Sequence, residues 1–147
     1  MATLMRREQI REVIRNREPF LLIDEITGLI PGQQAIAQLH LTGEEFWFSG
    51  HFPEYPLVPG SLIIEMIAQA AAVCALSLPE NSGKVVSLAA VDKARFRRKV
   101  FPEETLTVEA KIIKTRGNTK FVRGSAEVNG EAVLSANLVI ALSDALK

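Results

Sequence analysis

The feature that most constrains the fold is a long apolar segment at the centre of the chain, residues 62–78, which reads LIIEMIAQAAAVCALSL. As a helix it carries apolar side chains on nearly every side, and a helix of this kind is buried on most of its faces. Pro59-Gly60 stands where it begins, and Pro79 and Gly83 follow its end. We therefore predict a main helix within residues 57–78, enclosed by the rest of the domain.

The segments around this helix have the pattern of β-strands. In residues 33–42, alternate positions are apolar and should share one buried face: Ala35, Ala37, Leu39 and Leu41. We expect a short amphipathic helix at residues 6–14 and strands at residues 20–30, 33–42, 85–91, 94–100, 105–115, 119–128 and 131–142.

Turn residues separate the later strands. Arg116-Gly117-Asn118 indicates a hairpin, and Asn129-Gly130 a stronger one, because both central positions of a type I′ turn need a positive φ. One main helix followed mainly by antiparallel strands indicates an α+β class, and we treat residues 1–147 as a single domain. A single curled sheet around such a helix is the hot-dog fold, and sheets of this kind usually pair side by side to cover their edges.

Composition excludes several classes of function. The 17 basic and 17 acidic residues balance, so the chain lacks the basic field typical of nucleic-acid binders. Cys74 is the only cysteine and there are two histidines, so we expect no disulfide, no metal site and no cofactor. The first residues are charged where a signal peptide is apolar, and no apolar run has the roughly 20 residues that span a bilayer. We expect a cytoplasmic protein with no membrane or nucleic-acid partner.

The residues that indicate chemistry lie together in the segment 50–69, GHFPEYPLVPGSLIIEMIAQ. His51 heads a proline-rich loop, and Glu65 follows 14 residues later inside the apolar helix. A neutral imidazole suits proton abstraction near physiological pH. Burial of Glu65 among apolar side chains should raise its pKa and favour the protonated acid. The backbone N–H of Gly60, at the helix start, can polarise a carbonyl.

Other polar residues of this region receive supporting roles. Ser61, Glu65 and Gln69 fall one helical turn apart and therefore share one stripe of the helix. Gln69 is interpreted as a hydrogen-bonding support, and Ser61 as a hydroxyl close to the reacting centre. His40 lies on the polar face of its predicted strand, so we interpret it as a solvated side chain.

Gly50-His51-Phe52-Pro53, Pro56, Pro59-Gly60, Leu62, Glu65 and Ala68-Gln69 together resemble the (3R)-hydroxyacyl-[acyl carrier protein] dehydratases of the FabZ type. Residues 19–24 and 94–98 and the closing hairpin fit the same family in order, so the resemblance runs from about residue 15 to residue 140. Glutamate at position 65, where the related isomerising FabA type has aspartate, favours the non-isomerising branch.

The resemblance implies a hot-dog homodimer, commonly assembled into hexamers as a trimer of dimers, with each active site at the dimer interface. His51 of one subunit would work with Glu65 of the other. The implied reaction is the reversible removal of water from a 3-hydroxyacyl thioester to give the trans-2-enoyl product in type II fatty-acid synthesis. The implied partner is an acyl carrier protein whose phosphopantetheine arm holds the acyl chain.

Two further sets of residues are assigned to the substrate. Aromatic and apolar side chains of the loop before the helix are interpreted as the lining of the acyl tunnel: Phe52, Tyr55, Leu57 and Val58. Five of the seven residues from 93 to 99 are basic, and we interpret them as the docking patch for the acidic carrier protein: Lys93, Arg95, Arg97, Arg98 and Lys99. The alternative for this basic segment is a strand edge protected from aggregation by its charge.

The sequence also departs from the family pattern. Asn16 stands where the family often has histidine, and Ser61 where it usually has valine. These departures concern the acyl preference, so a specialised dehydratase of a polyketide or polyene pathway is one alternative. A hot-dog thioesterase, which would release free thiol, is a second alternative. A non-catalytic acyl-binding subunit is a third, and the intact pair of His51 and Glu65 argues against it.

Overall fold

The central helix forms where the sequence predicts it. The computed structural model describes residues 2–145, and helix α2 occupies Gly60–Leu76. Twelve of its 17 residues are buried, in agreement with an apolar surface on most sides. At its end the Asn81 side chain donates a hydrogen bond to the Ala75 carbonyl, and the 3₁₀ turn η1 (Pro79–Asn81) directs the chain away.

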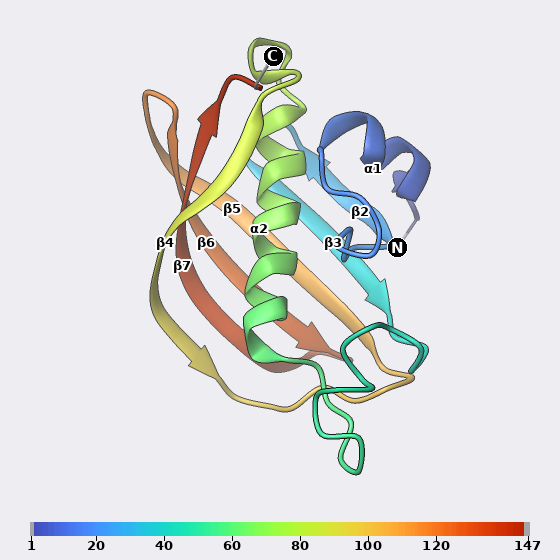
Figure 1. Ribbon diagram of the computed structural model, residues 1–147. Helices are drawn as coiled ribbons and strands as arrows, with labels where there is room; N and C mark the ends of the chain where they lie inside the picture. Colours follow the sequence, from blue (N-terminus) through green and yellow to red (C-terminus); the bar gives the residue numbers. More distant parts are fainter. Residues whose placement is uncertain (1, 146–147) are drawn as a thin grey trace.

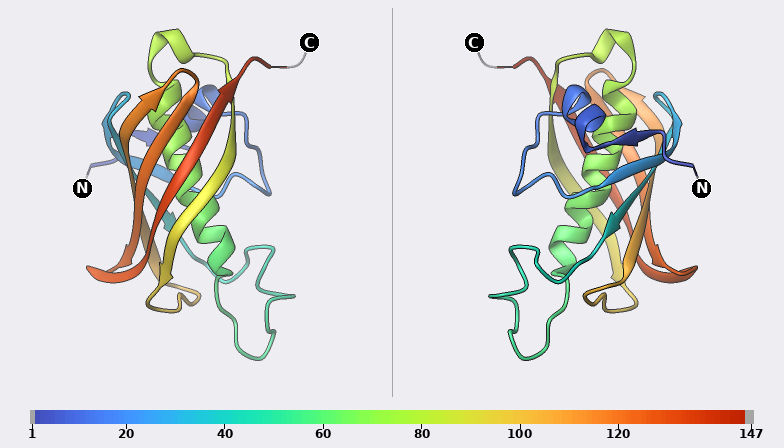
Figure 2. Two further views of the ribbon diagram at one scale, coloured as in Figure 1. Left: turned by 90° about the vertical axis from the view of Figure 1, so that its left-hand side faces the viewer. Right: turned by 90° about the vertical axis from the view of Figure 1, so that its right-hand side faces the viewer.

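A single antiparallel sheet curls around α2. Its seven strands lie in the order β1-β2-β3-β5-β6-β7-β4, and the short helix α1 (Arg7–Val13) packs beside them. The strands are β1 (Met5–Arg6), β2 (Glu25–Ile30), β3 (Gln34–His40), β4 (Val85–Phe96), β5 (Thr105–Arg116), β6 (Thr119–Val128) and β7 (Glu131–Ser143). Figures 1 and 2 show β4 and β2 on opposite sides of α2, with the helix on the concave face. This arrangement confirms the predicted α+β hot-dog fold.

The core lies between the concave face and the helix. The predicted inward face of β3 is confirmed, since Ala35, Ala37 and Leu39 are all buried. The turns are confirmed as well. Asn129 and Gly130 both have positive φ, as a type I′ turn requires, and Gly117 supplies the positive φ of the hairpin before β6. No helix within residues 2–145 is long and apolar enough to cross a membrane.

The predicted strand at residues 20–30 is wrong in its first half. Only Glu25–Ile30 is strand. The residues before it cross α2, where Leu22 N–H donates to the Gln69 side chain and the Phe20 carbonyl accepts from it. Leu21, Leu22 and Ile23 are buried in succession, which is incompatible with the alternation of a half-buried strand.

The two strands predicted at residues 85–91 and 94–100 are one strand, β4, which ends at Phe96. It pairs with β7 throughout, and the break that the sequence suggests is absorbed by a bulge between Asp92 and Arg95, where Lys93 has a φ of 53°. β4 is the last strand of the sheet, and Leu88 and Val91 on it are 41% and 42% exposed. It therefore presents an unpaired and partly apolar edge.

Candidate active site

The site begins at the first turn of α2. Pro59 is the N-cap residue, and neither a capping side chain nor an acidic residue serves this end of the helix. The first backbone donors paired here are Leu62 N–H and Ile63 N–H, both to the Pro59 carbonyl. Within the described part of the chain, the Gly60 N–H donates to no carbonyl or side chain, so it is available to an acceptor from outside.

Glu65 lies farther along α2, half-buried at a small cleft of about 40 Å³. The other residues that line this cleft are Asn16, Ala68, Gln69, Ala72, Val86 and Leu88. Burial raises the pKa of the Glu65 carboxyl, and a hydrogen bond from Gln69 partly opposes this shift. The environment therefore favours the protonated acid, as the sequence predicts.

Gln69 holds that carboxyl in place. It is 2% exposed, and its Nε2 donates to Glu65 Oε2 at 3.0 Å and to the Phe20 carbonyl at 2.8 Å. Its Oε1 accepts from Leu22 N–H at 2.9 Å. The amide group thus joins the helix to the segment that crosses it, and it engages only one oxygen of Glu65.

His51 lies in the long loop between β3 and α2, and Figure 1 shows this loop extending past the start of the helix. Its Nδ1 is 3.0 Å from the Leu57 carbonyl oxygen. Because a carbonyl only accepts, Nδ1 carries the hydrogen in the neutral ring, and Nε2 is left as a base. The ring also stacks on Phe52, with 4.3 Å between the ring centroids. His51 is not among the residues that line the Glu65 cleft, so a single chain does not assemble the pair there.

The predicted tunnel residues divide into two groups. Leu57 and Val58 line a cavity of about 300 Å³ together with Gly60. Phe52 and Tyr55 are 55% and 49% exposed and lie outside that cavity. Ser61 is also exposed, beside Gly60 at the helix start.

The predicted docking patch divides as well. Arg98 is held by ion pairs to Glu104 and Glu131, which raise the pKa of its guanidinium and compensate its charge within the chain. Lys99 lies over the Tyr55 ring, 5.1 Å from the centroid. The three remaining basic residues are exposed and form no ion pair within residues 2–145: Lys93, Arg95 and Arg97.

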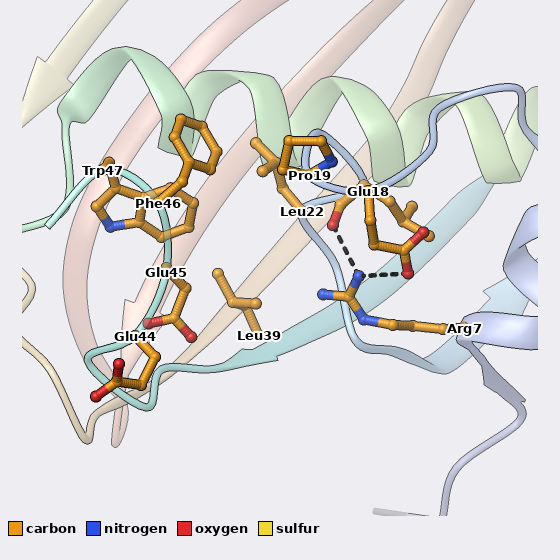
Figure 3. A pocket seen from close by; sticks show the side chains of 10 residues that line it. Arg7, Glu18, Pro19, Leu22, Leu39, Glu44, Glu45, Phe46 and Trp47 are labelled. Atoms are coloured by element: carbon orange, nitrogen blue, oxygen red, sulfur yellow. Dashed lines mark hydrogen bonds and ion pairs between the residues drawn. The ribbon is translucent and has the colours of Figure 1, made fainter. Parts of the chain in front are cut away.

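A second cavity, of about 320 Å³, lies beside the segment that crosses α2, residues 18–24, called here the crossing segment (Figure 3). Phe46 and Trp47 form one wall, Pro19 and Leu22 another, and Arg7 extends toward it while bound to Glu18. The sequence carries no signal for this cavity, because its walls come from α1, the crossing segment, β3 and the following loop. Only tertiary packing brings these four parts together.

Comparison with known proteins agrees with this geometry. The fold and the site together define a hot-dog protein whose central helix carries a half-buried glutamate. Residues 14–137 match the family model described as FabA-like domain, and the chain belongs to this family.

Among curated relatives, a 3-hydroxyacyl-[acyl-carrier-protein] dehydratase FabZ from Enterococcus faecalis is 45% identical over 130 residues, which cover 88% of this chain and 92% of the relative. A protein of the same name from Staphylococcus aureus is 42% identical over 144 residues, which cover 98% and 99%. The structure described as the dehydratase heterocomplex ApeI:P from Xenorhabdus doucetiae shares the fold, with a TM-score of 0.78 at 13% identity and coverage of 92% and 91%.

Proposed function

We propose that this protein catalyses the reversible dehydration of (3R)-3-hydroxyacyl thioesters of acyl carrier protein to the trans-2-enoyl thioesters. Its FabZ relatives are named as 3-hydroxyacyl-[acyl-carrier-protein] dehydratases. The observation that carries this proposal is Glu65. Its carboxyl is half-buried, has a raised pKa and is held through one oxygen by Gln69. Glu65 lies five residues after Gly60 on the same helix, and the Gly60 N–H is unpaired within the described residues. Helix α2 thus carries both a proton donor and a free backbone donor that can bind a carbonyl oxygen.

The chemistry divides among three groups. His51 Nε2 removes the proton from C2, and the electron pair of the C–H bond moves toward the thioester carbonyl. The Gly60 N–H stabilises the negative charge that develops on the carbonyl oxygen. Glu65 then gives its proton to the C3 hydroxyl, which leaves as water while the C2–C3 double bond forms. The proton on His51 returns to Glu65 through solvent, and the enzyme is reset.

We further propose that the active site needs two copies of the chain. The Glu65 cleft is lined by Val86 and Leu88 from β4, the strand whose outer edge is unpaired. A second copy that pairs with this edge brings its own His51 loop toward the cleft. The hexamer, a trimer of such dimers, stays a prediction from the family resemblance, as does the cytoplasmic location.

The carrier protein is proposed to dock beside the 300 Å³ cavity, whose wall includes both Arg97 and Gly60. Lys93 and Arg95 extend the same basic surface along β4. An acidic partner would therefore deliver its phosphopantetheine arm close to the start of α2. Arg98 also lines this cavity, but we propose that it adds no docking charge, because its guanidinium is already paired with Glu104 and Glu131.

The test is turnover of a 3-hydroxyacyl carrier protein, with enoyl product and free thiol followed in the same reaction. Wild type should form enoyl product, and His51→Ala should lose about 10²–10⁴-fold in rate. Thiol release without enoyl product would assign the protein to the thioesterases. Equal rates for wild type and His51→Ala would exclude His51 as the base.

A further inference from the structure

The aromatic ring of Phe96 lies against the start of α2. A Cβ built on Gly60 would be 2.5 Å from Phe96 Cε1 and 2.9 Å from Cδ1, distances that real Cβ atoms do not show. A side chain at position 60 would therefore have to displace the Phe96 ring. Since a Cβ is about 2.5 Å from its own backbone nitrogen, the ring edge lies within about 5 Å of the Gly60 nitrogen.

The packing of the core does not explain Phe96. It is 58% exposed, more than any other large apolar side chain in the described chain. It is the last residue of β4, paired with Leu134 of β7 just after the bulge that follows Asp92. The bulge changes the register of the strand, so the ring is placed over the helix start by a specific irregularity of the backbone.

The ring forms part of the wall of the 300 Å³ cavity that also includes Gly60, Leu57, Val58 and Ile63. Gly60, whose N–H we propose as the donor to the thioester oxygen, thus shares this cavity with the Phe96 ring. In a bound thioester, C2 is two bonds from that oxygen. Any substituent on C2 must therefore share the space beside Gly60 with the Phe96 ring.

We propose that Phe96 is a specificity-determining residue that excludes a branch at C2. The protein dehydrates 3-hydroxyacyl thioesters that are unbranched at C2 and rejects their 2-methyl counterparts. This inference rests on the proposed dehydratase function and narrows its substrate class. It also separates a fatty-acid enzyme, whose substrates are unbranched, from a pathway that handles 2-methyl chains.

The experiment compares 3-hydroxybutyryl and 2-methyl-3-hydroxybutyryl carrier protein, each C2 epimer separately, with the enoyl product quantified by mass spectrometry. Wild type, Phe96→Ala and Phe96→Leu are measured, and thermal unfolding confirms that each variant is folded. Ile113→Ala is the matched control, because Ile113 is a 51% exposed apolar residue on β5 away from the cavity.

We expect the ratio of branched to unbranched turnover to rise by about 10–100-fold in Phe96→Ala, because a pocket discriminates one methyl group by about this factor. Phe96→Leu should give a smaller rise, and Ile113→Ala none. An unchanged ratio in both Phe96 variants, or equal use of both substrates by wild type, would overturn the inference. Failure of wild type to dehydrate even the unbranched substrate would instead overturn the proposed function, and this inference with it.

Discussion

Replacement of Gln69 by leucine tests whether its amide joins the helix to the segment that crosses it. The change leaves the buried Leu22 N–H without a partner, which costs about 1–3 kcal/mol, and removes a bond to the part-buried Phe20 carbonyl worth about 1 kcal/mol. The leucine side chain returns about 1 kcal/mol through its own burial. The net loss is about 2 kcal/mol, or roughly 4–8 °C in Tm for a domain of this size.

The assay is thermal and urea unfolding at one fixed protein concentration, since association of subunits changes apparent stability. Gln34→Leu is the matched control, because Gln34 makes a single side-chain bond, 3.2 Å to Glu109, and its loss should cost less than about 0.5 kcal/mol. Gln69→Leu also frees Glu65 from a bond that lowers its pKa, so the loss of activity with rising pH should move to higher pH. The reasoning would be refuted if the two variants were equally stable and if the activity of Gln69→Leu were lost at the same pH as that of wild type.

Three further predictions concern the site and its surroundings. Glu65→Gln should slow dehydration by about 10²–10⁴-fold. Because burial raises the pKa of Glu65, the ionised carboxyl weakens the fold as pH rises through that pKa. In unfolding at several pH values, Glu65→Gln should therefore be at least as stable as wild type near pH 7, with no such advantage in acid. Arg95→Ala should raise the KM for carrier-linked substrate and reduce its salt dependence, whereas Arg98→Ala should lower Tm without changing that salt dependence. Val91→Glu, on the open edge of β4, should give a smaller species by size-exclusion chromatography, and an unchanged elution volume would argue against pairing through this edge.

The bounds of α2 and the hairpin turns could be predicted because they depend on residues at the position itself. Proline before Gly60 and again at Pro79 limits the helix through missing donors and a fixed φ. Asn129-Gly130 sets its turn because few residues tolerate two successive positive φ values. The link between His51 and Glu65 as an acid–base pair was likewise suggested by residue type and spacing within one short segment.

Other features depend on residues that are distant in the sequence. The apolar run at residues 20–24 has the composition of a strand, yet its backbone is bound by Gln69, 47 residues beyond Leu22. The sequence predicts Arg98 as one of the docking charges, and only the folded structure shows that its guanidinium is paired with Glu104 and Glu131. The contact of Phe96 with Gly60 has no sequence signal, since a bulge in β4 places it.

The sequence by itself therefore determined the helix, the turns, the hot-dog fold and the residue types of the candidate site. Only the tertiary structure decided which of those residues are free to act. Within residues 2–145 it leaves a carboxyl fixed through one oxygen, a helix N–H without an acceptor, and three basic side chains without an ion pair. The physical reason is that backbone conformation responds to local sterics, whereas pairing, burial and pKa depend on groups that only the folded chain brings into contact.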